Sequence, residues 1–361
     1  MCYPSRETMR RVLLTALLSA LVLSVPGPLR AQQDGQTSAS TPELELHSDF
    51  WLNLHHFLYL QARLRAAAGK PATRESQTQP EFSSARPTGD LTPTEQRTWS
   101  AALDTYAQDW ASRDMLRNGD MVIVSNRLAE LEDCSDLSGR DGQQCVPGLR
   151  ADLVAALLTA APIYRAHWWP QQDRENRAWM ASVTPLVRRM GSDIATRLVR
   201  IYQHPWPPGR MRVDVVWYAG PLGSYTTFDP AHITISSHDS RNQGLAAFEM
   251  LFHEASHTFG EGVDEAIERH SRELGKLVPR DLWHAILFYT TGELVRREIA
   301  NSPDLATEWA STTGYTPYAV RNGVYDNGWS DYQPVIEQYW QAYLDGEIDF
   351  DTAIERIVNA V

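Results

Sequence analysis

The pentad His253-Glu254-Ala255-Ser256-His257 is the feature that most constrains the fold and the chemistry of this chain. Histidines four positions apart lie one turn apart on the same face of a helix, so both imidazoles can reach one metal ion. A carboxylate between them can take a proton from a water that the metal polarises. A buried helix with these groups and no metal would leave polar atoms that are costly to satisfy. The pattern therefore predicts a helix that carries a metal site.

The segments around the pentad predict strands followed by helices. Two β-rich runs occupy residues 211–218 and 232–236, and glycine and Asp-Pro turns bracket them. Apolar residues at helical spacing then predict a series of helices toward the C-terminus. We expect these at residues 244–259, 263–274, 279–300 and 331–343, with a short one near the end. Residues 209–361 are therefore expected to form one region around the metal site.

Residues 46–208 are predicted to be helical and carry no motif that implies chemistry. The adjacent histidines His55 and His56 point about 100° apart on a helix, so we expect them to pack and hydrogen-bond rather than share a metal. Residues 70–93 contain four prolines and predict a long loop. Helices are expected at residues 47–68, 94–117, 120–131, 150–166 and 172–204. The fold class is therefore predicted to be α+β and predominantly helical.

The N-terminus has the pattern of a signal peptide. Arginines precede the apolar run Val12–Val25, and a Pro-Gly-Pro break and a small-residue cleavage pattern follow it. This run is short for a membrane span, which needs about 20 apolar residues. We expect residues 1–31 to be removed and residues 32–45 to be a flexible leader. The mature chain is then periplasmic or secreted, without stable membrane insertion, and an uncleaved anchor is the alternative.

Export makes the two remaining cysteines interpretable. Cys134 and Cys145 lie eleven positions apart in a segment rich in Gly, Ser and Asp. In an oxidising compartment the simplest expectation is one disulfide that closes a surface loop over residues 134–145. In the chain-entropy model, a loop of this size is stabilised by roughly 3 kcal/mol.

The charge of the chain excludes some classes of partner. With 33 Lys and Arg against 45 Asp and Glu, the formal net charge is −12. An acidic surface repels phosphate, so we expect neither nucleic acid nor an anionic membrane as a partner.

The pentad resembles the active-site helix of the zincin metallopeptidases, and the thermolysin-like gluzincins more than the metzincins. The metzincin pattern is only half met, because Gly260 is in place but Val263 stands at the third-ligand position. The resemblance implies a zincin-like catalytic core with a small antiparallel sheet and one Zn²⁺ per chain. It also implies that His253 and His257 are metal ligands and that Glu254 is the general base. In such enzymes an antiparallel edge strand holds the substrate, and residues 232–236 are the candidate here.

The third metal ligand is predicted to come from the helix at residues 279–300. Glu293 is preferred because gluzincins use a glutamate from a later helix, and Gly292 beside it permits close approach of another helix. His284 is the alternative, and nine residues place the two on opposite faces of the helix. A salt bridge from Glu293 to Arg297 would be the purely structural role. The remaining candidates are Asp264, Glu265 and Glu268.

A donor for the developing oxyanion is also expected. Tyr289 is the first candidate, because it lies one turn before Glu293. His284 would suit this catalytic role if Glu293 is the ligand. Other candidates occur in a later segment rich in Gly and Tyr, namely Tyr315, Tyr318, Arg321 and Tyr325.

These features together predict an exported zinc-dependent hydrolase that cuts peptide bonds in a peptide or protein substrate. Two alternatives stay open. One is a non-catalytic zincin-like binding or scaffold protein, against which the intact Glu254 argues. The other is a zinc amidase that acts on cell-wall peptide.

Overall fold

The computed structural model describes residues 38–40, 43–67, 89–131, 137, 148–302, 304 and 314–361. The predicted signal peptide, both cysteines of the predicted disulfide and most of the predicted 70–93 loop lie outside these residues. Thr37–Val361 forms one compact unit, which contains both expected regions, 46–208 and 209–361. The described chain is predominantly helical with one small sheet, as the α+β prediction requires.

The sheet is mixed rather than antiparallel, which corrects the expectation. Its strand order is β1-β2-β3-β5-β4. The central pairs β2–β3 and β3–β5 are parallel, whereas β1 and β4 pair antiparallel with β2 and β5 at the two ends. The strands are β1 (Ser38–Ser40), β2 (Leu44–His47), β3 (Met211–Val216), β4 (Ser224–Thr227) and β5 (His232–Ser236). Parallel neighbours need long crossover connections, and the helices between β2 and β3 supply one.

Two expectations about strands are wrong. The expected edge strand, β5, lies inside the sheet between β3 and β4, so β4 is the end strand on that side. The expected flexible leader, residues 32–45, overlaps β1 and the start of β2, where Leu44 is fully buried. Both β2 and β4 are only four residues long, which gives little period-2 signal in the sequence.

The first helices after β2 pack together into a core of their own, which we call the N-terminal core. They are α1 (Phe50–Ala67), α3 (Pro93–Asp109), α4 (Gly119–Ala129) and α5 (Ala151–His167). The start of α3 is set by its sequence, because Thr92 and Glu95 form a capping box and Pro93 occupies the first turn. The buried side chains of this core include residues 216–219 and 225, so the end of β3 and the strand β4 join the helices to the sheet.

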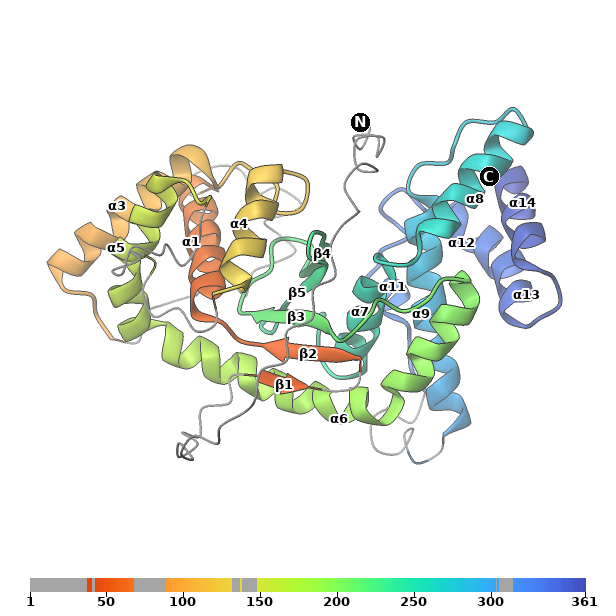
Figure 1. The fold of residues 1–361 in the computed structure, drawn as a ribbon, viewed down its shortest axis with the longest axis horizontal. Helices are drawn as coiled ribbons and strands as arrows, with labels where there is room; N and C mark the ends of the chain where they lie inside the picture. The colour runs from red at the N-terminus through yellow and green to blue at the C-terminus, as the bar shows by residue number, and fades with distance from the viewer. Residues whose placement is uncertain are drawn as a thin grey trace, which may run out of the picture. The chain divides into compact units, whose positions relative to one another are not determined.

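The 34-residue helix α6 (Trp169–Tyr202) connects this core to the rest of the unit. Figure 1 shows it crossing from the group around α1, α3 and α5 toward α7 and α9. Its buried residues from Trp179 to Tyr202 belong to a second cluster, the C-terminal core, together with the sheet and the later helices. This packing holds both expected regions within the one compact unit.

The later helices follow the sequence prediction closely. They are α7 (Leu245–Ser256), α8 (Glu261–Glu273), α9 (Leu282–Asn301), α11 (Tyr318–Arg321), α12 (Tyr332–Val335), α13 (Gln341–Leu344) and α14 (Phe350–Ala360). A five-residue π-helix, Ile336–Trp340, joins α12 to α13, so the expected helix over 331–343 is present with a local change of pitch.

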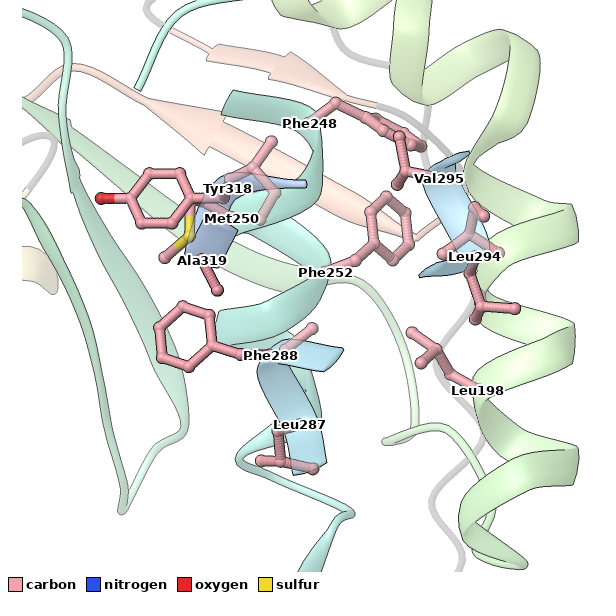
Figure 2. Close-up of a cluster of buried hydrophobic side chains, with 14 of the residues drawn as sticks. Leu198, Phe248, Met250, Phe252, Leu287, Phe288, Leu294, Val295, Tyr318 and Ala319 are labelled. Atoms are coloured by element: carbon pink, nitrogen blue, oxygen red, sulfur yellow. The ribbon is translucent and has the colours of Figure 1, made fainter. Parts of the chain in front are cut away.

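Apolar side chains from the three helices α6, α7 and α9 pack against one another. Figure 2 shows Phe248 and Phe252 of α7 with Leu198 of α6 and Leu294 and Val295 of α9. These side chains are nearly or completely excluded from solvent, which fixes how α7 and α9 sit against each other. Among the described residues, no helix is both long and apolar enough to cross a membrane.

Candidate metal centre

Helix α7 carries the pentad and is buried along its whole length. All twelve of its residues are buried, and strands β4 and β5 lie against it. The helix ends at Ser256, and His257 is its C-cap in helical conformation. The side chains of His253 and His257 therefore keep the one-turn spacing that the sequence predicted, with ring centroids 5.0 Å apart.

A third histidine completes a cluster with these two. His284 lies in the first turn of α9, and its Nε2 is 3.2 Å from Nε2 of His253. Each of the three residues offers one ring nitrogen, and these nitrogens all lie within 4.8 Å of one another. The cluster could hold a metal ion, because imidazole nitrogens are the ligands that zinc and other first-row metals accept at about 2 Å.

Aromatic side chains enclose the three imidazoles. Phe288, one turn after His284 on α9, stacks on the His253 ring with centroids 3.7 Å apart. Trp283 meets the His257 ring edge-on, and Trp329 meets the His284 ring in the same way. This apolar wall fixes the ring orientations and lowers the local polarity around any bound ion.

The histidines of the cluster are neutral near pH 7. Burial lowers the pKa of His253 and of His257 well below the ordinary value, and the neighbouring imidazoles act in the same direction. Burial also lowers the pKa of His284 to about 4, and the positive charge of Arg117 contributes. Neutral imidazole is the form that ligates a metal, so no proton has to be displaced before binding.

Glu254 lies beside the cluster and is held by the end strand of the sheet. Ser224 and Thr226 of β4 donate hydrogen bonds to its carboxylate at 2.7 and 2.8 Å. Its Oε2 lies 3.9 Å from Nε2 of His257. Burial raises the pKa of Glu254 to about 7, although the two hydroxyl donors oppose this shift. A carboxyl with a pKa near neutrality is suited to exchange protons with a reacting group.

The structure places Glu293 away from the cluster, which corrects the preferred third ligand. Its carboxylate accepts hydrogen bonds from Arg296 at 2.6 and 2.7 Å and from Arg297 at 2.6 Å. Burial acts to raise its pKa, but the two guanidinium groups outweigh this and lower it. The alternative of a salt bridge to Arg297 is the one observed, and His284 takes the place beside His253.

Most of the other predicted ligands and donors also lie outside the histidine cluster. Tyr289 donates to Gln341 at 2.6 Å and lines the same surface groove as Glu293, so it does not face the histidines. The three acidic candidates of α8 do not belong to the histidine cluster within the described part of the chain. They are Asp264, Glu265 and Glu268. His284, considered as an oxyanion donor, belongs to the cluster itself.

Glu249 anchors the segment that carries the remaining tyrosine candidates. Its carboxylate is fully buried one turn before His253 and accepts hydrogen bonds from the Tyr315 hydroxyl at 2.5 Å and the Tyr318 backbone N–H at 3.0 Å. A Cβ at Gly292 would lie 3.0 Å from this carboxylate and 2.7 Å from Pro317. The close approach expected at Gly292 is therefore made by Glu249 and by the chain before α11.

Among the tyrosine candidates, Tyr318 is the one on which the charge of the proposed base acts. Burial raises its pKa to about 12, and the charge of Glu254 adds to this shift. Figure 2 shows the Tyr318 hydroxyl directed away from the labelled apolar side chains.

Ser224 and Thr226 are the site residues that sequence reasoning missed. They occupy alternate positions of a four-residue strand, and alternate residues of a strand face the same side of the sheet. The only sequence signal was a short polar run, Ser-Tyr-Thr-Thr, after Gly223.

Comparison of the chain with protein-family models, with curated proteins and with solved structures finds no match in any of the three.

Proposed function

We propose that this chain is an exported zinc-dependent peptidase of the zincin type, with three histidine ligands. The observation that carries the proposal is the cluster of the buried His253 with the half-buried His257 and His284, and with Glu254 beside it. Three histidines leave a fourth position of a tetrahedral zinc ion open, which is the arrangement of catalytic rather than structural zinc sites. The export rests on the N-terminal pattern of residues 1–31.

The chemistry divides between the metal and the chain. A zinc ion in this position would supply Lewis acidity, which lowers the pKa of a water and polarises the substrate carbonyl. Glu254 accepts a proton from the attacking water and passes it to the leaving amine. Ser224 and Thr226 hold its carboxylate in place for both transfers. The aromatic wall of Phe288 and Trp283 limits access of bulk water to the site.

Strand β4 is the element proposed to align the substrate. It pairs antiparallel with β5 at the end of the sheet, and its polar side chains contact the proposed base. An extended peptide that adds to such a strand is held by backbone hydrogen bonds, which suits a polypeptide substrate. Tyr318 is the proposed donor to the oxyanion that develops on the scissile carbonyl.

His284 as the third metal ligand differs from the gluzincin pattern that the sequence suggested. A gluzincin needs a carboxylate there, whereas the carboxylate of Glu293 is bound by Arg296 and Arg297. The proposal is therefore a zincin-type site whose third ligand, His284, comes from the helix after α8, with 26 residues between it and His257.

The test compares Glu254→Gln with wild type on labelled proteins, labelled peptides and cell-wall fragments. Because glutamine cannot accept the proton, we expect the variant to keep zinc and to lose at least about 10²-fold in turnover. Glu355→Gln, a change of an exposed carboxylate on α14, is the matched control. An unchanged rate in Glu254→Gln contradicts the mechanism, and cleavage of wall fragments alone replaces the peptidase with a wall amidase.

A further inference from the structure

The backbone just before β4 is held by the turn that follows β5. Arg241 Nη2 donates to the carbonyl of Pro221 at 3.0 Å, and Asn242 Nδ2 donates to the carbonyl of Gly223 at 2.8 Å. The Arg241 guanidinium also makes a bidentate pair with the buried carboxylate of Asp239, at 3.0 and 2.6 Å. The charge of Arg241 is therefore balanced locally, and its role at the start of β4 is structural.

A second guanidinium, from α11, contacts the turn that follows β5. Nη2 of Arg321, the last residue of that helix, donates to the carbonyl of Arg241 at 2.8 Å. The Arg321 residue is exposed, and within the described part of the chain its side chain makes no ion pair. The nearby carboxylate of Glu249 is buried and bound by Tyr315 and by the Tyr318 backbone. Arg321 therefore presents a positive charge to solvent in a protein with a net charge of −12.

This charge lies within electrostatic reach of the proposed catalytic groups. Tyr318 precedes Arg321 on α11 by one turn, and its pKa responds to burial first and then to the charges of Arg241, Asp239, Glu254 and Arg321. The charges of Glu254 and of the two arginines therefore all act on this phenol. The same helix supplies both the proposed oxyanion donor and the exposed cation.

Chain direction decides which part of a substrate would meet Arg321. A peptide that pairs antiparallel with β4 runs from the Thr227 end toward the Ser224 end of the strand. Its C-terminal part, on the leaving-group side of the scissile bond, then lies at the Ser224 end. The polypeptide there would come beside the turn at Arg241 and the guanidinium of Arg321.

We infer that Arg321 determines specificity by binding a substrate carboxylate on the leaving-group side of the scissile bond. A guanidinium matches a carboxylate with two parallel hydrogen bonds, so an acidic group in this position is selected over a neutral one. The carboxylate can be the C-terminus of a short peptide or the side chain of an acidic residue. This inference rests on the proposed peptidase function and on substrate pairing with β4.

The test uses three peptides with the same scissile bond. The first ends in a free carboxylate, the second is its amide, and the third is an amide with glutamate near the leaving-group end. We expect wild type to prefer the carboxylate peptides by about tenfold in kcat/KM, since hydrogen bonds to charged groups are of that strength. Arg321→Ala should abolish this preference, Arg321→Glu should reverse it, and Arg321→Lys should restore part of it. Arg272→Ala, on the exposed side of α8, is the control that should keep it.

The outcomes separate the two proposals. Preference for the free acid over both amides identifies the C-terminus as the group bound, and equal preference for the glutamate amide identifies an acidic side chain. An unchanged ratio of acid to amide in Arg321→Ala overturns the inference while the peptidase stands. An equal loss on all three peptides also overturns it, because Arg321 would then act on the fold of α11. Failure of wild type to cleave any of them, with zinc bound, overturns the peptidase function itself.

Discussion

Two groups of histidines in the described part of the chain have surroundings that differ in kind. His55 and His56 lie in the N-terminal core, where their ring nitrogens meet hydroxyl and carbonyl oxygens. His253, His257 and His284 lie beside α7, where the ring nitrogens meet one another. Burial lowers the pKa in both groups. Low pKa alone therefore does not mark a site that could hold a metal, whereas the convergence of three imidazole nitrogens does.

Three of the four ring nitrogens of the N-terminal pair have oxygen partners, and His55 Nε2 is the exception. His56 Nε2 pairs with the Tyr225 hydroxyl and Nδ1 with the Leu52 carbonyl, each at 2.8 Å. His55 Nδ1 pairs with the Tyr106 hydroxyl, also at 2.8 Å. These bonds tie α1 to α3 and to β4, as the expectation of packing and hydrogen bonding required. The same network thus supports, from the other side, the strand that holds Glu254.

The largest expected difference between the two groups is the effect of zinc on stability. A ligand that binds only the folded state, at 1,000 times its dissociation constant, raises the free energy of unfolding by about 4 kcal/mol. We expect this gain in wild type and in His56→Gln when zinc is added after chelation, and no gain in His257→Ala. Denaturant unfolding with and without zinc measures it. A full zinc gain in His257→Ala would break the distinction between the groups.

The next effect is the pH dependence that His56 confers. Burial lowers its folded pKa to about 4 from 6.5, with Leu52 and Asp214 acting to raise it and His232 to lower it. The unfolded chain therefore binds a proton that the folded chain does not, so stability is lost as pH falls from 6.5 to 4. The loss from this group is about 3 kcal/mol. Unfolding at pH 7, 6 and 5 should show a shallower decline in His56→Gln, and parallel declines would contradict the assignment.

The smallest effect is expected from removing a single partner of the N-terminal pair. Tyr106→Phe deletes the hydroxyl that meets His55 and leaves a buried nitrogen without it, which costs about 2 kcal/mol. Zinc content should not change, because the Tyr106 hydroxyl pairs with His55 and not with a histidine of the cluster. Thermal unfolding and metal analysis of the same preparation check both points. Loss of zinc in this variant would show that the two groups are coupled.

Much of the helical architecture could be predicted from periodicity and from Pro and Gly breakers. The helices α3, α5, α7 and α9 begin within a few residues of their expected positions. The short strands β2 and β4 could not be found in this way, since four residues give no clear alternation. The expectation of an antiparallel sheet came from a family resemblance, whereas both central pairs are parallel. The long helical connection allows this for β2 and β3, and the intervening strand β4 allows it for β3 and β5.

The identity of the third ligand, His284, could not be predicted from the sequence alone. Both His284 and Glu293 lie on α9, and the choice between them depends on which face of α9 packs against α7. That choice is made by apolar residues of α6, α7 and α9 (Figure 2), which lie far apart in the sequence. A local signal did exist, because Arg296 and Arg297 follow Glu293 at the spacing that forms salt bridges on a helix.

The most direct test of the account is the zinc content of the purified mature chain, measured by mass spectrometry beside two matched variants. The account predicts one zinc per wild-type chain, loss of zinc in His284→Ala and retention of zinc in Glu293→Ala. Retention in His284→Ala with loss in Glu293→Ala would contradict the three-histidine site. A wild-type chain that holds no zinc after loading would contradict the metal centre altogether.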